Sequence, residues 1–114
     1  MDSELYLRGI RLFNSGAYFE AHEVLEDVWR AAPAPEKRFL QGLIQVAVGL
    51  HHHSKGNVVG ARSLLGRAAR NLSSYPEDFG GIELPELLHS LTQWQHALAE
   101  SKSVPPAPRF VVNF

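Results

Sequence analysis

The sequence lacks several features that would assign a function directly. It contains no cysteine, which excludes disulfide bonds, thiolate-bound metals and cysteine nucleophiles. It also lacks the G-x-S-x-G, phosphate-loop and G-x-G-x-x-G motifs of common enzyme classes. Neither sign of charge dominates, because 11 Lys and Arg residues stand against 12 Asp and Glu residues. Charge therefore gives no reason to expect a nucleic-acid or membrane partner.

A membrane-spanning run and a signal segment are missing as well. The most apolar stretch, residues 43–50, contains Gln45 and is far too short to cross a bilayer. The first four residues, Met1 to Glu4, are acidic and form no apolar signal segment. We therefore expect a cytoplasmic protein with no membrane partner. The 114 residues fit one domain that buries one hydrophobic core.

Apolar residues recur at helical spacing along most of the chain, and Gly, Pro and Asn mark the breaks between the periodic segments. The pattern predicts an all-α fold with helices at residues 3–14, 17–31, 35–54, 57–72 and 85–101. The third segment is apolar on most sides, which predicts the centre of a helical bundle. We expect one helical domain at residues 1–101 and an extended Pro-rich tail at 102–114. The end of this tail, residues 109–114, is too apolar for a plain solvated segment.

A shift of forty residues aligns the first two predicted helices with the next two. Identical residues then pair as Gly9/Gly49, Gly16/Gly56, Ala21/Ala61, Leu25/Leu65 and Arg30/Arg70. The repeat predicts two hairpins, similar to those of tetratricopeptide proteins, with the fifth helix covering the exposed end. The alternative is that two helical hairpins share Gly and Ala by chance.

Polar residues fall on one strip of each of two predicted helices. On the second helix, His22 lies on the apolar face and Glu26 at its edge, one turn away. On the third helix, Gln41, Gln45 and His52 follow one narrow strip. Because buried polar groups need partners, we expect the two strips to face each other in one hydrogen-bonded network, joined also by Glu23.

Three interpretations of this network stay open: a device that fixes helix register, a small-ligand pocket, and a metal site. We expect no cofactor and no metal, because bundles that bind two metals use Glu-x-x-His pairs and neither polar strip contains one. If a divalent metal does bind, its ligands would be His22, Glu26 and His52. The run His51-His52-His53 is weak support, because consecutive helical residues point in different directions.

Two blocks of sequence resemble a known prokaryotic family. The first is Arg11-Leu12-Phe13-Asn14, Gly16, residues 18–27 and Trp29-Arg30, and the second is residues 39–45, Leu50-His51-His52, Gly56-Asn57, Gly60-Ala61 and Leu64-Leu65. The family is domain-of-unknown-function family 309 (DUF309), whose members are small bacterial all-helical proteins. The resemblance implies a compact helical fold and no established activity. It also implies that the signature positions are Glu20, His22, Glu23, Glu26, Trp29, Arg30, Gln41, Gln45, His51 and His52.

Two functional hypotheses follow. The first is a binding or interaction module, with a groove beside the first and third helices that holds a protein segment or a small ligand. The chain's own residues 110–114, or those of a partner subunit in a homodimer, would be able to fill that groove. The second is a small metal-dependent or acid/base hydrolase-like enzyme that uses His22, Glu23, Glu26 and His52. A nucleic-acid role is not expected, because no aromatic residues lie between Arg62, Arg67 and Arg70. An open pocket would favour a ligand, and a sealed network would favour a structural role.

Overall fold

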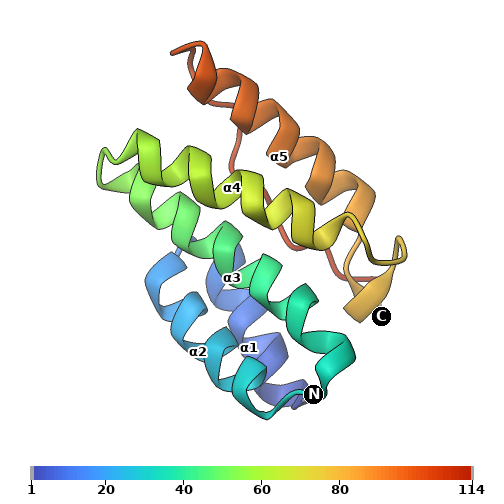
Figure 1. The fold of residues 1–114 in the computed structure, drawn as a ribbon. Coiled ribbons are helices and arrows are strands. Elements are labelled where there is room, and N and C mark those ends of the chain that lie inside the picture. Colours follow the sequence, from blue (N-terminus) through green and yellow to red (C-terminus); the bar gives the residue numbers. More distant parts are fainter. Residues whose placement is uncertain (1, 114) are drawn as a thin grey trace.

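The protein folds into five α-helices and a short 3-10 turn in a computed structural model that describes residues 2–113 (Figure 1). The elements are α1 (Ser3–Asn14), α2 (Tyr18–Ala31), α3 (Ala34–Ser54), α4 (Val58–Leu72), η1 (Phe79–Gly81) and α5 (Leu84–Ala99). These bounds confirm the predicted all-α class and lie within two residues of each predicted helix end. The described residues contain no β-strand and only one isolated antiparallel bridge, between Ile82 and Val112.

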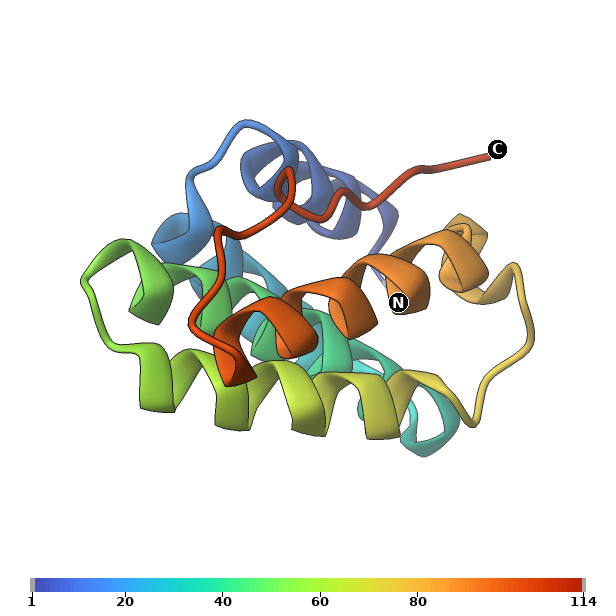
Figure 2. The same ribbon diagram turned by 90° about the horizontal axis from the view of Figure 1, so that it is seen from above.

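Helices that follow one another in the sequence also pack against one another. Contacts join α1 to α2, α2 to α3, α3 to α4 and α4 to α5, so α3 lies in the middle of the stack (Figures 1 and 2). Its central place agrees with its apolar sequence. Within residues 2–113, no helix is both long enough and apolar enough to span a membrane.

The turns within the two hairpins have the same hydrogen bonds. At the end of α1, the Gly16 N–H donates to Phe13 O at 3.0 Å and the Ala17 N–H donates to Leu12 O at 2.9 Å. Forty residues later, the Gly56 and Asn57 N–H groups repeat both bonds at 3.0 and 2.9 Å, to His53 O and His52 O. Gly16 and Gly56 have φ angles of 89° and 80°, which a residue with a side chain adopts only with strain.

The helices of each hairpin meet where a glycine of the first faces a leucine of the second. A Cβ atom added to Gly9 would lie 2.7 Å from Leu25 Cδ2, and one added to Gly49 would lie 3.0 Å from Leu65 Cδ2. Both leucines are fully buried. The predicted repeat therefore recurs as a turn and as a contact. The likeness to tetratricopeptide hairpins stays a prediction.

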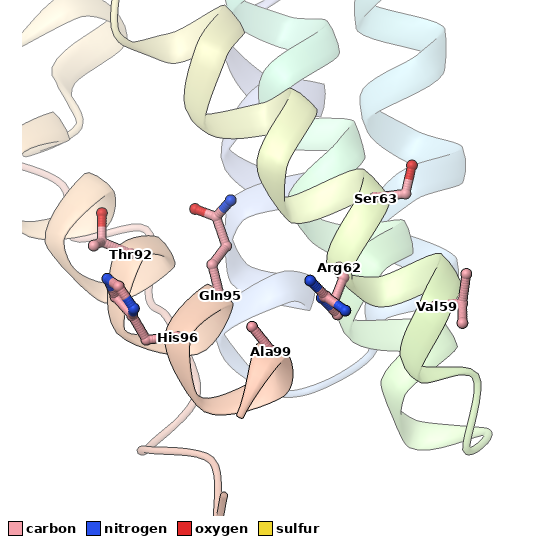
Figure 3. Close-up of a pocket in the computed structure, with 7 residues that line it drawn as sticks. All are labelled: Val59, Arg62, Ser63, Thr92, Gln95, His96 and Ala99. Atoms are coloured by element: carbon pink, nitrogen blue, oxygen red, sulfur yellow. The ribbon is translucent and has the colours of Figure 1, made fainter. Parts of the chain in front are cut away.

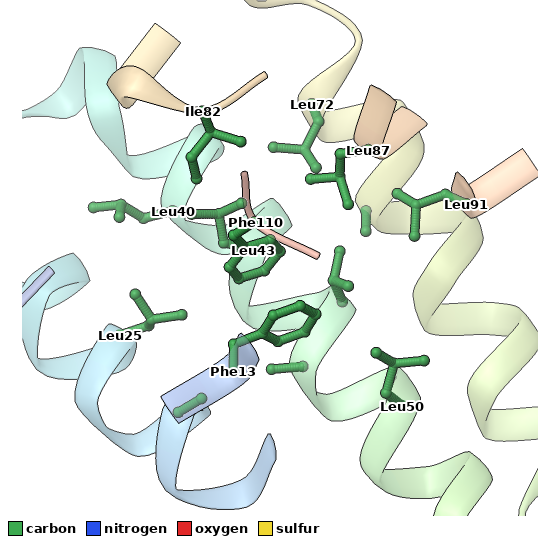
Figure 4. Close-up of a cluster of buried hydrophobic side chains, with 14 of the residues drawn as sticks. Phe13, Leu25, Leu40, Leu43, Leu50, Leu72, Ile82, Leu87, Leu91 and Phe110 are labelled. Atoms are coloured by element: carbon green, nitrogen blue, oxygen red, sulfur yellow. The ribbon is translucent and has the colours of Figure 1, made fainter. Parts of the chain in front are cut away.

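The tail packs against the helices instead of extending into solvent. Figure 2 shows it running between α1 and α5. The Phe110 ring is fully buried and stacks on Phe13 of α1, with the ring centroids 3.7 Å apart (Figure 4). Asn14 binds Phe110 twice, because its Nδ2 donates to Phe110 O at 3.0 Å and its Oδ1 accepts from the Phe110 N–H at 2.9 Å. Trp94 of α5 donates through Nε1 to Pro106 O at 3.0 Å.

The last described residues then pair with the segment before α5. The Glu83 N–H donates to Val111 O and the Asn113 N–H donates to Gly81 O, both at 2.9 Å. The tail thus covers the side of α1 that the sequence left open as a groove. Phe114, which belongs to the segment we expected there, lies outside the described residues.

Candidate functional site

The polar residues of α2 and α3 do not form the single buried network that the sequence predicts. His22 pairs with Glu26 on α2, with 2.7 Å between Nε2 and Oε1, and its Nδ1 lies 2.7 Å from Phe19 O. The His22 side chain keeps 20% of its surface exposed. Neither His22 nor Glu26 bonds to the polar strip of α3 within residues 2–113. The predicted network was wrong, because helical periodicity gives the face of a residue but not which side chains come within hydrogen-bonding distance.

The strip of α3 instead bonds toward α4. Gln45 Oε1 accepts from Asn71 Nδ2 of α4 at 2.8 Å, and Asn71 Oδ1 accepts from Arg38 Nε at 3.0 Å. At the other end of α3, His52 Nδ1 lies 3.2 Å from the side-chain nitrogen of Asn57. These bonds link α3 to α4 and to the turn between them.

The three side chains that we named as metal ligands do not converge. Within residues 2–113, no group of three or more His, Cys, Asp or Glu side chains could hold a metal ion. His22 and Glu26 form a pair, whereas His52 bonds at the α3–α4 turn. The described residues therefore offer no set of metal ligands of the kind proposed from the sequence.

A groove opens where α2 and α4 flank α3, and we call it the Trp29 groove. It has a volume of about 240 Å³. Its lining consists of Glu26, Trp29, Gln41, Ile44, Gln45, Val48 and Leu64. Four of these, namely Glu26, Trp29, Gln41 and Gln45, are among the residues predicted from the sequence. Ile44, Val48 and Leu64 were missed as site residues, because apolar residues at helical spacing indicate core packing and not a pocket.

Trp29 carries an unsatisfied hydrogen-bond donor beside this groove. Its ring lines the groove, but its indole Nε1 atom is buried and has no hydrogen-bond partner among the described residues. A buried donor without a partner costs about 1–3 kcal/mol. The Lys37 ammonium lies 4.3 Å from the centroid of the ring and donates to Trp29 O at 2.6 Å. These contacts hold the ring in place without satisfying its N–H.

The other predicted site residues lie around the groove and not in it. Glu20 and Glu23 are exposed on α2, and Arg30 is exposed and paired with Asp27. His51 is half-buried beside Phe19, with the ring centroids 5.4 Å apart. Phe19, which is 51% exposed, extends the aromatic surface at the start of α2.

The groups with shifted pKa values lie outside the Trp29 groove. Burial raises the pKa of Tyr6, and the negative charge of Glu36 raises it further. Burial also raises the pKa of Tyr18. A hydrogen bond with Glu86 raises the pKa of Glu83. These groups belong to the surroundings of the tail and of α1, so they do not mark an acid/base centre at the groove.

Known proteins with similar sequences come from bacteria. An uncharacterized protein YpuF of Bacillus subtilis (strain 168) is 37% identical over 93 residues, which are 76% of this chain and 53% of that protein. An uncharacterized protein of Aquifex aeolicus (strain VF5) is 32% identical over 87 residues, which are 75% of this chain and 26% of that protein. The chain thus spans about half of one relative and about a quarter of the other.

A family model covers the hairpin region. The model is described as a domain of unknown function (DUF309), and it matches residues 6–64, which include α2, α3 and every lining residue of the Trp29 groove. The match agrees with the resemblance found in the sequence. The chain belongs to the DUF309 family.

Proposed function

We propose that this protein is a binding module that holds a short segment of a partner protein in the Trp29 groove. The observation that carries the proposal is that Trp29, whose buried indole N–H has no partner among the described residues, lines this groove. A hydrogen-bond acceptor on a bound segment would remove the cost of that donor after a small shift of the ring. In the free protein, no group within residues 2–113 accepts a hydrogen bond from this indole N–H.

The floor and rim of the groove indicate what the segment must present. Ile44, Val48 and Leu64 are half-buried and supply an apolar floor, which suits one apolar anchor side chain. Gln41 and Gln45 at the rim offer amide groups for a peptide backbone. Glu23 and Glu26 place negative charge beside the groove. The proposed segment therefore combines an apolar anchor with a basic residue.

Binding has more support than the acid/base or metal-dependent enzyme. A hydrolase would need His22, Glu26 and His52 to converge on one substrate, together with a nucleophile or an activated water. His22 and Glu26 bond to each other on α2, while His52 bonds at the turn before α4. The open Trp29 groove also favours a ligand over a sealed structural network.

Crosslinking tests the proposal. A photo-crosslinking amino acid is placed at Val48, in the groove floor, and in a matched variant at Arg67, an exposed residue of α4 outside the groove. Each variant is expressed in bacterial cells, and the crosslinked peptides are identified by mass spectrometry. We expect one recurrent segment with an apolar and a basic residue from position 48 only. Equal crosslinking from both positions would contradict the proposal.

A Trp29→Phe variant then tests the N–H group itself. A synthetic copy of the crosslinked segment is titrated by calorimetry into the parent and the variant. We expect about tenfold weaker binding to Trp29→Phe, because one hydrogen bond of about 1–1.5 kcal/mol is lost while most of the ring surface remains. The unfolding free energy should change little, since the variant also removes an unpaired donor. Equal affinity for both proteins would show that the indole N–H takes no part.

Elemental analysis tests the enzyme alternative. Tag-free protein is purified without a chelator and analysed by mass spectrometry for zinc, iron and manganese. We expect no stoichiometric metal, because no three potential ligands meet within residues 2–113. Near-stoichiometric metal that disappears in His52→Ala would make the metal-dependent enzyme the leading hypothesis.

A further inference from the structure

A larger pocket lies between α4 and α5, apart from the Trp29 groove. Its volume is about 600 Å³ (Figure 3). Arg62 extends from α4 toward α5, and Gln95 extends from α5 toward α4. Ser63 of α4 and Thr92 and His96 of α5 add further polar groups. The pocket is thus framed by two helices that are not paired along their full length.

The Gln95 side chain of α5 reaches the backbone of α4 at Gly66, beside this pocket. A Cβ atom added to Gly66 of α4 would lie 3.2 Å from Gln95 Nε2 and 3.6 Å from Arg70 Nη1. The missing side chain of Gly66 therefore leaves room for the Gln95 amide against α4. Val59 of α4 and Ala99 of α5 line the pocket at one end. Val59 is 80% exposed, so this end presents an uncovered apolar surface.

The lining of the pocket can donate many hydrogen bonds and carries no carboxylate. Arg62 has five N–H donors, and Gln95, His96, Ser63 and Thr92 add amide, imidazole and hydroxyl donors. Within residues 2–113, the side chains of Arg62 and His96 make no hydrogen bond or ion pair with other residues. The segment 55–70 contains Lys55, Arg62, Arg67 and Arg70 and no Asp or Glu. An anion would meet positive charge here and no repulsion from the pocket walls.

We propose that the α4–α5 pocket binds a phosphate monoester of a small organic compound. Arg62 and Gln95 place donors from both helices in the pocket, and the guanidinium of Arg62 suits a two-oxygen contact with a phosphate group. Val59 and Ala99 would contact the apolar part of the ester. The proposal does not depend on the Trp29 groove, because it shares no residue with it.

Titrations with phenyl phosphate and with inorganic phosphate, followed by ¹H–¹⁵N NMR at constant ionic strength, test the proposal. We expect saturable shifts of the amides of residues 59–63 and 92–99, and tighter binding of phenyl phosphate than of inorganic phosphate. Arg62→Gln should weaken the binding of phenyl phosphate about tenfold. Arg67→Gln removes the same charge from an exposed position outside the pocket and should leave the affinity nearly unchanged.

Three results would overturn the proposal. Non-saturable shifts up to the millimolar range would show that no site exists. An equal loss of affinity in Arg62→Gln and Arg67→Gln would show that the phosphate responds only to the overall charge of α4. Equal affinity for phenyl phosphate and inorganic phosphate would show that Val59 and Ala99 contribute no apolar contact. Both arginines are exposed, so the two variants should fold as the parent does.

Discussion

Asn14 and Ser54 occupy equivalent positions at the ends of α1 and α3, yet their side chains bond in different directions. Asn14 reaches across to the tail and pairs with both backbone groups of Phe110. Ser54 turns back on its own helix, where its hydroxyl donates to His51 O at 2.6 Å. The turns that follow have the same hydrogen bonds. The repeat thus determines the backbone, while single side chains decide what each hairpin contacts.

The second helices of the two hairpins differ in charge. Acidic residues on α2 are Glu20, Glu23, Glu26 and Asp27, whereas α4 and the turn before it carry only basic charges. One acidic residue of α2, Glu26, lines the Trp29 groove, and one basic residue of α4, Arg62, lines the α4–α5 pocket. The second helices of two similar hairpins thus differ in the sign of their charges although their turns share hydrogen bonds.

Among the substitutions considered, removing the Phe110 ring should change the free energy of unfolding most. Phe110→Ala leaves a cavity against Phe13 and should lower the free energy of unfolding by about 3–5 kcal/mol in urea denaturation. The matched control is Val112→Ala, because Val112 is 39% exposed. This substitution should lower the free energy of unfolding by less than about 1 kcal/mol. Similar values for both variants would mean that the tail does not complete the core beside α1.

The two glycine–leucine contacts should respond unequally to the same substitution. Gly9→Ala brings a methyl group to 2.7 Å from Leu25, and we expect a loss of about 1–3 kcal/mol of unfolding free energy. Gly49→Ala meets Leu65 at 3.0 Å, so its smaller clash should be offset by alanine's helix preference of about 1 kcal/mol. Thermal and urea unfolding of both variants would measure this. Equal losses would mean that the two hairpins pack with the same tolerance.

The side chains at the ends of α1 and α3 give a smaller contrast. Asn14→Ala leaves the N–H and C=O groups of Phe110 without their partners and should lower the unfolding free energy by about 1–2 kcal/mol. Ser54→Ala removes the hydrogen bond from an exposed hydroxyl to His51 O. This substitution should change the unfolding free energy by less than about 0.5 kcal/mol. Amide exchange at Phe110 provides a direct check, because it should accelerate in Asn14→Ala alone.

A small effect is also expected at His22. Its ion pair with Glu26 spans one helical turn on the surface of α2, and such pairs contribute about 0.3–0.5 kcal/mol. His22→Ala should therefore lower the unfolding free energy by less than about 1 kcal/mol, and Glu26→Gln by a similar amount. A decrease of several kcal/mol in the unfolding free energy of His22→Ala would contradict this expectation, because a surface pair contributes far less.

Local signals in the sequence were sufficient to predict the helices. Gly16 and Gly56 stand just after the ends of α1 and α3, and Pro35 lies in the first turn of α3. These signals work because backbone conformation at a helix end depends on a few neighbouring residues. The central position of α3 followed from its apolar composition in the same way.

Contacts between distant segments could not be predicted in the same way. The sequence placed Gln45 on a polar strip, but Asn71 of α4 was not recognised as its partner. The apolar end of the tail was noted, yet the bond between Asn14 and Phe110 joins residues too far apart for any periodic pattern. The α4–α5 pocket was missed because Arg62 and His96 look like solvated surface residues until the helices are placed side by side.

The contact between Phe13 and Phe110 also bears on how the chain is made. A ribosome synthesises the first helix early and the tail late, at about 5–20 residues per second. The Phe110 ring that covers Phe13 is therefore synthesised on the order of 5–20 s after Phe13. Helices α1 and α2 can pair within that interval. During that interval the nascent chain exposes an aromatic surface, and transiently exposed surfaces of this kind promote aggregation.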